Sequence, residues 1–345
     1  MVGLGVIGLE HMHVLEMVDG LVGAGATTVS HTSVDDSLAD LYASWRQDSR
    51  PTDAASVLSD PDVDLVVLAG VPAERAGHAV AALRAGKDVL TAKPGAVTVD
   101  QLGAVRAAAD DAGGRWWVMF SERLANPAVL GAVELARAGA IGRVVHVEGT
   151  APHRLSAADR PAWFFDRARS GGIVVDLCSH QVDQFLALTG ADAASVEVAA
   201  AVGSTRRSEV GPVPAGFEDL GELWLAAPGV RGHHRVDWLE PDGFPTWGDV
   251  RLVVTGTDGR LDVRIPVDLG GGDAIAGRSE LRVTDHDGVR VVEDLPSPTW
   301  AADLLADRLD RGERLMSFDH PYDVTGLTLR AAAVATGWGS GGGPA

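Results

Sequence analysis

Short apolar runs alternate with alanine-rich stretches over the first 120 residues of the chain. Five of the runs have the length of a strand and lie at 4–7, 26–30, 65–69, 88–90 and 116–120. The stretches 78–85 and 99–112 have helical composition, and Gly86 stands where a helix C-cap is expected. Because strands of this kind alternate with helices in parallel sheets covered on both faces, we predict an α/β doubly wound domain.

The pattern changes after about residue 122. Helix-like segments at 127–138 and 173–188, the second ending at Gly190, flank a β-rich run at 143–149. Further β-rich segments follow at 196–202, 220–225, 233–238, 250–256, 261–265, 281–284 and 289–292, several of them joined by Gly or Asp-Gly turns. A last helical segment covers 321–336. We therefore predict a first domain at 1–121 and a second, mostly antiparallel α/β domain at 122–345, whose last helix is free to pack back on the first.

Composition supports two domains and excludes several kinds of partner. The 345 residues exceed the usual size of one domain, roughly 150 residues. The formal net charge of -19 repels phosphate backbones and anionic lipid, so we expect neither nucleic acid nor membrane binding. The chain lacks a basic leader and an apolar stretch of 18 residues, which favours a cytoplasmic protein. Cys178 is the single cysteine, so no disulfide can form within the chain.

A glycine-rich turn follows the first predicted strand. Gly3, Gly5 and Gly8 spell G-x-G-x-x-G, but this register leaves only two residues for the strand before it. The favoured register makes Gly8 the tight turn, and Glu10 then replaces the second glycine of the motif. A carboxylate there repels a pyrophosphate unless it turns away. The turn is thus open to two interpretations, a dinucleotide loop or a plain buried strand and turn.

The end of the second strand leaves the choice of dinucleotide open. No carboxylate occurs at 30–33 to bind an adenosine ribose, and Asp35 and Asp36 come slightly late. The hydroxyl groups there could bind a 2′-phosphate, although no arginine is near. A polar strand end without a ligand is the alternative.

Lys93 follows the strand at 88–90 and precedes Pro94. Ligands of parallel sheets bind at the carboxyl edge, where a lysine can stabilise a reacting oxygen and a proline fixes the turn. The alternative is a solvated surface lysine.

Asp176, His180 and Asp183 fall on one face of a predicted helix that its apolar neighbours should bury for the most part. These neighbours are Val175, Leu177, Val182, Phe185 and Leu186. A carboxylate beside an imidazole fixes its tautomer and raises its basicity, which suits proton transfer. The alternative is an i,i+4 pair that only stabilises the helix. A metal site needs further ligands, and none is evident at suitable spacing, so we expect no metal.

Together these motifs resemble the Gfo/Idh/MocA oxidoreductases. The resemblance rests on the glycine turn, on 92–94 and on Gly171-Gly172-x-x-x-Asp176-x-x-x-His180-x-x-Asp183, with 140–144 and 256–259 in support. It implies a Rossmann domain joined to an α/β domain whose open sheet forms a homodimer or homotetramer interface. It also implies transfer of hydride between NAD or NADP and a sugar, polyol or glycoside.

The resemblance assigns roles to individual residues. His180 is the general base, Asp176 orients it, and Lys93 stabilises the reacting oxygen. The cofactor residues that it implies are Gly8, Leu9, Glu10, His11, Met12, His31, Thr32, Ser33, Gly70, Lys93 and Pro94. The substrate candidates are Glu122, His153, Arg154, Trp163 and Asp183.

Two departures from the family pattern motivate a second hypothesis. Ala92 replaces the usual glutamate before Lys-Pro, and Glu10 stands in the nucleotide loop. A ligand- or cofactor-sensing protein that has lost turnover is therefore the alternative. Arg154 or Arg160 could bind a carboxylate, but the acidic balance favours a neutral sugar or polyol. Trp163 suits either stacking on a sugar or core packing.

Overall fold

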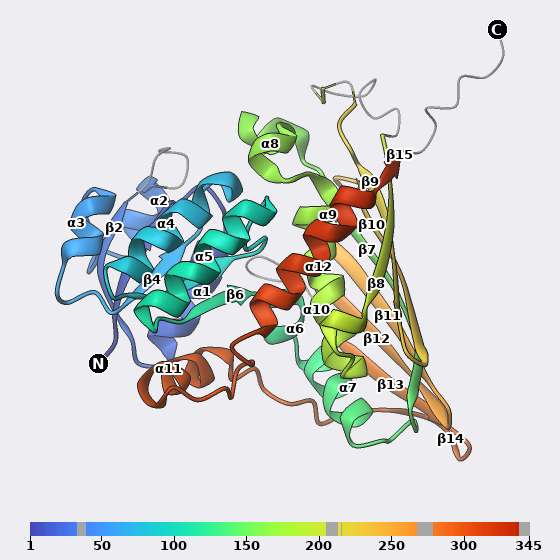
Figure 1. Cartoon of the computed structure of the whole chain (residues 1–345). Coiled ribbons are helices and arrows are strands. Elements are labelled where there is room, and N and C mark those ends of the chain that lie inside the picture. The colour runs from blue at the N-terminus through green and yellow to red at the C-terminus, as the bar shows by residue number, and fades with distance from the viewer. Residues whose placement is uncertain (33–38, 205–212, 215, 268–278, 338–345) are drawn as a thin grey trace, which may run out of the picture. The chain divides into compact units, whose positions relative to one another are not determined.

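The chain forms two compact units in a computed structural model that describes residues 1–32, 39–204, 213–214, 216–267 and 279–337 (Figure 1). The first unit comprises Met1–Met119, Ala168–Gly171 and Thr299–Thr325. The second comprises Phe120–Arg167, Gly172–Pro298 and Gly326–Ala345. The segment 299–325 thus joins the first unit, although it comes late in the chain.

A six-stranded sheet forms the centre of the first unit, in the order β3-β2-β1-β4-β5-β6. All neighbouring strands are parallel, which confirms the predicted doubly wound sheet. The strands are β1 (Gly3–Ile7), β2 (Thr27–Thr32), β3 (Arg50–Pro51), β4 (Leu65–Leu68), β5 (Asp88–Ala92) and β6 (Trp116–Met119). The strand order reverses between β1 and β4, and ligands of such sheets bind beyond the carboxyl ends at this point.

Helices α1 (His13–Gly23), α2 (Ala39–Trp45), α3 (Ala54–Ser59), α4 (Pro72–Arg84) and α5 (Val99–Ala112) connect these strands. Thr98 caps α5 by accepting a hydrogen bond from the amide of Gln101, and Gly113 ends it with a φ of 62°. A further helix, α11 (Trp300–Asp310), packs on α1. Gly20 makes room for it, because a Cβ there would come within 2.3 Å of the Trp300 ring.

A nine-stranded sheet forms the second unit, in the order β14-β13-β12-β11-β7-β10-β9-β8-β15. The strands are β7 (Val144–Arg154), β8 (Glu197–Gly203), β9 (Leu220–Ala227), β10 (Val230–Glu240), β11 (Gly248–Gly256), β12 (Gly259–Val267), β13 (Glu280–Asp285), β14 (Gly288–Val291) and β15 (Thr336–Gly337). β7 and β10 are parallel, as are β8 and β15, and the other neighbours are antiparallel. The prediction of a mostly antiparallel sheet is confirmed.

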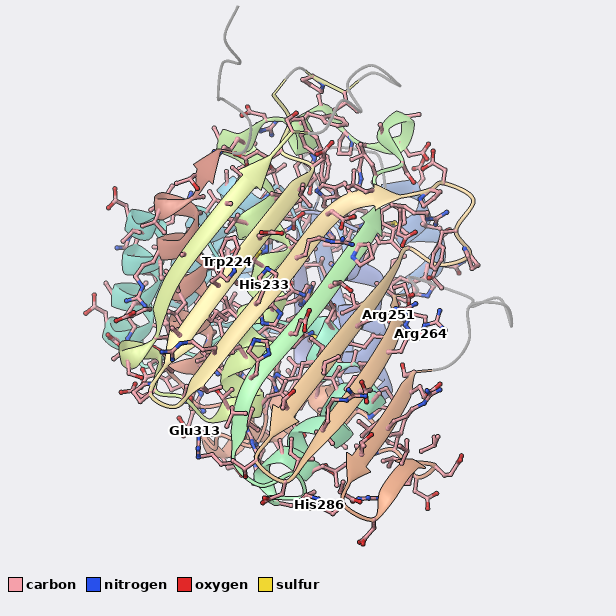
Figure 2. All side chains as sticks on the ribbon, turned by 90° about the vertical axis from the view of Figure 1, so that its right-hand side faces the viewer. Trp224, His233, Arg251, Arg264, His286 and Glu313 are labelled. Atoms are coloured by element: carbon pink, nitrogen blue, oxygen red, sulfur yellow. The ribbon has the colours of Figure 1, made fainter. Side chains whose placement is uncertain are left out.

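Helices cover one face of this sheet. α6 (Ser121–Leu124), α7 (Pro127–Arg137), α9 (Gly172–Asp176) and α10 (Cys178–Thr189) belong to this layer, and α12 (His320–Val334) follows late in the chain. Gly232 on β10 admits α10 closely, since a Cβ there would lie 2.9 Å from the Phe185 ring. The residues that alternate with these buried positions form the other face, on which Trp224, His233, Arg251 and Arg264 lie (Figure 2).

The helix predicted at 173–188 is divided into α9 and α10. Leu177 separates them while keeping helical dihedrals, and the amide of His180 donates to its carbonyl at 3.1 Å. Gly190 ends α10 in the left-handed conformation, as expected. The tightened turn at Leu177 keeps the chain helical between Asp176 and His180, so the two side chains come from successive turns.

Candidate functional site

The turn after β1 requires glycine. Gly8 has a φ of +83°, and a Cβ at this position would lie 2.3 Å from the Cα of Gly70. Gly70 follows β4, so the two glycines meet where the strand order reverses. The first turn of the sheet therefore has the close backbone approach that a dinucleotide loop requires.

The loop from Gly8 leads into α1, which begins at His13. The side chain of Met12 does not cap this helix, and the amide of His13 donates to Nδ1 of His11 at 3.3 Å. The rings of His11 and His13 stack at 4.6 Å. The start of α1 thus follows the first turn of the sheet, the place at which doubly wound domains bind the phosphates of a dinucleotide.

Glu10 lies inside the turn. Its side chain is buried, and Oε2 would be 2.9 Å from a Cβ on Gly8 and 3.2 Å from one on Gly70. The carboxylate thus faces the two glycines. A dinucleotide fits the backbone of this turn, and Glu10 is the residue whose charge it must accommodate.

The end of β2 is partly buried. His31 lies in the core, where Nδ1 is 2.8 Å from the Ser49 hydroxyl and the ring packs on Tyr42. Burial lowers the pKa of His31, so the ring is neutral. Thr32 is half-buried, while Ser33, like Asp35 and Asp36, lies outside the described residues. Of the two predicted ribose contacts that the structure describes, His31 is buried and Thr32 has the more accessible side chain.

Lys93 ends up buried, with 4% of its surface exposed, at the end of β5. Arg75 from α4 organises this strand end. Its Nη1 donates to the carbonyl oxygens of Ala92 and Lys93 at 3.0 and 2.8 Å, and its Nε donates to Gly70 at 2.6 Å. The buried guanidinium thus ties the Lys93 backbone to the Gly70 turn. Arg75 was not predicted as a site residue, because nothing in an alanine-rich helix distinguishes it from a surface arginine.

Asp176 and His180 lie in the second unit, at the end of α9 and the start of α10. His180 is buried and Asp176 half-buried. Cys178, between them, is fully buried, and the carboxylates of Glu122 and Asp176 add to the burial that raises its thiol pKa. The thiol therefore stays protonated and packs, and Asp176 and His180 are left as the groups suited to proton transfer.

Glu122 lies beneath α10 in a buried polar cluster. Its Oε2 accepts hydrogen bonds from the Nε2 atoms of Gln181 and Gln184, both at 3.2 Å. Its Oε1 is 3.6 Å from Nε2 of His153, whose Nδ1 lies 3.1 Å from the Ala151 carbonyl. Two of the predicted substrate residues thus meet each other. The two glutamines were missed, although they flank Asp183 on a helix that was expected to be mostly buried.

Asp183 forms a buried ion pair with Arg123. Its two carboxylate oxygens accept from Nε and Nη2 of Arg123, both at 2.6 Å, and Asp183 has no exposed surface. The pair joins α6 to α10. Asp183 was grouped with the substrate residues on spacing, and its geometry fits a role in holding α10 in place.

Arg154 is the last residue of β7, and Trp163 lies in the segment that follows. Trp163 is buried, and its ring packs edge-on against Phe164 at 6.2 Å, which suits the core-packing alternative. Nη1 of Arg154 donates to the carbonyl of Asp242 at 3.1 Å.

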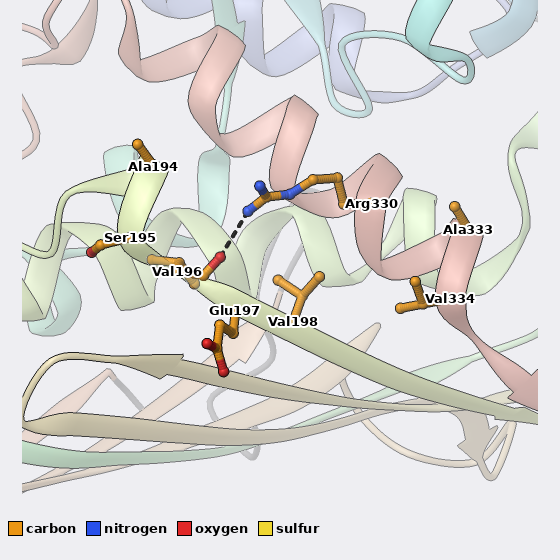
Figure 3. A pocket seen from close by; sticks show the side chains of 8 residues that line it. All are labelled: Ala194, Ser195, Val196, Glu197, Val198, Arg330, Ala333 and Val334. Carbon is orange, nitrogen blue, oxygen red and sulfur yellow. Dashed lines mark hydrogen bonds between the residues drawn. The ribbon is translucent and has the colours of Figure 1, made fainter.

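A separate groove of about 580 Å³ lies between α12 and the start of β8 (Figure 3). It is lined by Ala194, Ser195, Val196, Glu197, Val198, Arg330, Ala333 and Val334. Arg330 donates to the Val196 carbonyl at 2.8 Å across one end. None of the predicted site residues lines it.

Two kinds of feature are absent from the described residues. No group of three histidine, cysteine or acidic side chains is arranged to hold a metal ion. No helix in this part of the chain combines the length and apolar character needed to cross a bilayer.

Family models match both parts of the chain. Residues 1–120 match an oxidoreductase family with an NAD-binding Rossmann fold, and residues 129–262 match the GFO/IDH/MocA C-terminal domain. A crystal structure assigned provisionally as an oxidoreductase from Erwinia carotovora atroseptica is 32% identical, has a TM-score of 0.90 and covers 98% of this chain and 100% of its own.

Curated relatives match over shorter spans. Inositol 2-dehydrogenase from Acidothermus cellulolyticus is 33% identical over 48% of this chain and 52% of its own length. D-xylose dehydrogenase from Paenarthrobacter nicotinovorans is 24% identical over 73% of this chain and 62% of its own. The chain thus spans between about half and three-fifths of these relatives.

Proposed function

Because the chain belongs to the Gfo/Idh/MocA family of oxidoreductases, we propose that it transfers hydride between a nicotinamide dinucleotide and a carbinol carbon. The proposed substrate is a sugar, a polyol or cyclitol, or a glycoside. The relatives named for xylose and inositol support this class. The observation that carries the proposal is the buried helical turn that presents Asp176 and His180 in succession.

Three side chains carry the proposed chemistry. His180 takes the proton of the reacting hydroxyl, or returns it in the reverse direction. Asp176 orients the imidazole and favours its charged form. Lys93 donates a hydrogen bond to the reacting oxygen and stabilises negative charge on it. The resemblance to the family supports these roles, and the burial of Lys93 and His180 strengthens the electrostatic effects.

The cofactor supplies or accepts the hydride when it is bound. The residues proposed to hold it are Gly8–Met12, Gly70, Thr32 and the Lys93-Pro94 turn. The choice between NAD and NADP stays open in this proposal, because positions 30–33 offer no carboxylate for an adenosine ribose and no arginine is near in the sequence for a 2′-phosphate.

The outer face of the nine-stranded sheet is the proposed contact between copies of this chain. Trp224 there is 39% exposed, and its ring stacks on His233 at 5.3 Å (Figure 2). An exposed tryptophan on a broad strand face is typical of interfaces. We propose a homodimer or homotetramer built on this face.

Cofactor binding tests the proposal first. Titration of the purified chain with NADH and with NADPH, followed by nicotinamide fluorescence and native mass spectrometry, should show binding of one or both. Turnover with sugars and cyclitols should then change the absorbance at 340 nm.

His180→Asn should reduce kcat by at least about 100-fold, because general acid-base catalysis contributes on this scale, while NADH binding is retained. The matched control is His286→Asn, in the exposed turn between β13 and β14 of the nine-stranded sheet. It should leave kcat unchanged. A His180→Asn variant with wild-type kcat refutes the assignment of the base. NADH binding without turnover of any compound supports the sensing alternative.

A further inference from the structure

Two guanidinium groups lie against one tryptophan ring in the second unit. The Cζ atoms of Arg154 and Arg160 are 5.3 and 4.7 Å from the centre of the Trp247 ring. Arg160 also lies 4.3 Å from the centre of the Phe164 ring and 5.0 Å from that of Trp238. Aromatic faces attract cations but do not neutralise them, so two positive charges are concentrated here.

No carboxylate among the described residues forms an ion pair with either guanidinium. Arg154 Nη1 donates to the backbone carbonyl of Asp242 at 3.1 Å, and Arg160 Nε donates to that of Leu155 at 3.0 Å. Nε of Arg154 and Nη2 of Arg160 are buried and have no acceptor in the described part of the chain. Buried donors without acceptors cost free energy that a ligand acceptor would recover.

Other arginines in the same unit form ion pairs with carboxylates. Arg251 and Arg264 on the outer sheet face share the carboxylate of Asp249, with nitrogen–oxygen distances of 2.7 and 2.8 Å. This contrast is notable in a chain of net charge -19, where carboxylates are plentiful. The pair at Trp247 is therefore a local positive site in an acidic protein.

The pair lies near the proposed proton-transfer group. Burial lowers the pKa of Arg160 to about 10, and the nearby carboxylates of Asp176 and Asp159 oppose this shift. The Asp176 carboxylate is thus close enough to act on the charge of Arg160. A ligand whose hydroxyl reaches Asp176 and His180 would bring its remaining groups toward these arginines.

We propose that Arg154 and Arg160 bind a carboxylate group of the substrate, which is then a sugar acid or a carboxylated polyol. The planar fork of a guanidinium matches a carboxylate in two parallel hydrogen bonds. A carboxylate is favoured over a phosphate ester because its single charge is repelled less by the acidic molecule. This inference rests on the proposed function and narrows its substrate class.

Matched pairs of compounds test the inference with the full chain and its cofactor. The pairs are D-glucose with D-glucuronate and D-galactose with D-galacturonate, and glucose 6-phosphate serves as the phosphate probe. We expect the best acid to have a kcat/KM at least about 10-fold above that of its neutral partner, as charge-assisted hydrogen bonds provide. Calorimetric titration of the same compounds measures binding independently of turnover.

Substitutions of the two arginines test whether the preference for the acid depends on them. Arg160→Gln and Arg154→Gln should each lower kcat/KM and binding for the acid by about 10- to 100-fold and change those for the neutral partner by less than about 3-fold. Arg251→Gln, on the outer face, is the matched control and should leave the preference unchanged. Circular dichroism and the neutral-sugar activity show that each variant is folded.

The outcomes separate this inference from the proposed function. Turnover with equal or better use of the neutral sugars in both pairs overturns the inference and leaves the proposed function intact. A preference for glucose 6-phosphate overturns the assignment to a carboxylate. Acid binding that depends on Arg160, without turnover, supports the arginine site and refutes the dehydrogenase proposal. Acid binding that is absent, or unchanged in Arg160→Gln, refutes the site.

Discussion

His234 shows how strongly a single residue is constrained by the sheet around it. It lies fully buried on β10 opposite Gly149 of β7, and a Cβ on that glycine would be 2.6 Å from its Nδ1. Burial, together with the charges of His233 and His146, lowers its pKa to about 3 from 6.5. The ring is therefore neutral in the folded protein down to low pH.

The difference in proton binding at His234 between the folded and unfolded chain makes the free energy of unfolding depend on pH. Below pH 6.5 the unfolded chain binds a proton at His234 that the folded chain does not, so the free energy of unfolding falls. Between pH 6.5 and about 3 this residue contributes a loss of up to about 1.4 kcal/mol per pH unit. Urea denaturation of wild type and His234→Leu at pH 7, 6, 5 and 4 should show a shallower decline for the variant. Parallel declines in both proteins contradict the buried neutral state.

The chemistry of individual residues could be predicted only in part from the sequence. Lys93, Asp176 and His180 stand out because their types and spacing are unusual next to a strand end or on an apolar helix. Arg75, and the glutamines that bind Glu122, do not, because their partners come from distant parts of the chain. The pairing of Arg123 with Asp183 was also not predicted, because the two residues lie 60 positions apart in the chain.

At the scale of elements, patterns of apolar residues predicted most of the strands. Both ends of α5 agree with the prediction because local signals, the Thr98 cap and Gly113, define them. α11 was not predicted, since its position depends on the contact of Trp300 with Gly20 across nearly the whole chain. The division of 173–188 at Leu177 was also missed, because it arises from a one-residue tightening that leaves the helical pattern unchanged.

Close packing at the start of β1 gives a prediction for this element. A Cβ on Gly3 would lie 1.8 Å from the carbonyl oxygen of Asp62, which is backbone and cannot rotate away. Gly3→Ala should lower the free energy of unfolding by about 2–3 kcal/mol, as expected for overpacking. Gly77→Ala on α4 is the control, because nothing lies within 4 Å of its Cβ position. It should be neutral or stabilising by up to about 1 kcal/mol. Equal unfolding midpoints in urea for the two variants would contradict this account.

At the scale of the whole molecule, the early division into two parts followed from length and from the change of pattern near residue 122. The assignment of residues 299–325 to the first unit did not follow, because it depends on ion pairs such as Arg308 with Asp64 and Asp88. The net charge of -19 still predicts a negative electrostatic field around the molecule as a whole. The two arginines beside Trp247 create a local positive site within that field.

The outer sheet face gives a prediction about assembly. Trp224→Asp places a charge in the centre of the proposed interface and should convert the oligomer to monomer. Size-exclusion chromatography with light scattering measures this directly. Val289→Asp, an exposed change on the edge strand β14, is the control and should leave the mass unchanged. A wild-type protein that is already monomeric, or a Trp224→Asp variant of unchanged mass, contradicts the proposed interface.

The central claim is that this chain moves a hydride between a carbinol carbon and nicotinamide. The most direct test uses a substrate found in the sugar panel, prepared with deuterium on its carbinol carbons, and incubates it with the wild-type chain and the oxidised dinucleotide. We expect deuterium at C4 of the nicotinamide ring in the reduced cofactor, detected by mass spectrometry and NMR. With His180→Asn, we expect this transfer of deuterium to be lost. Reduced cofactor without deuterium, or oxidation of the substrate with the deuterium released to water, would contradict it.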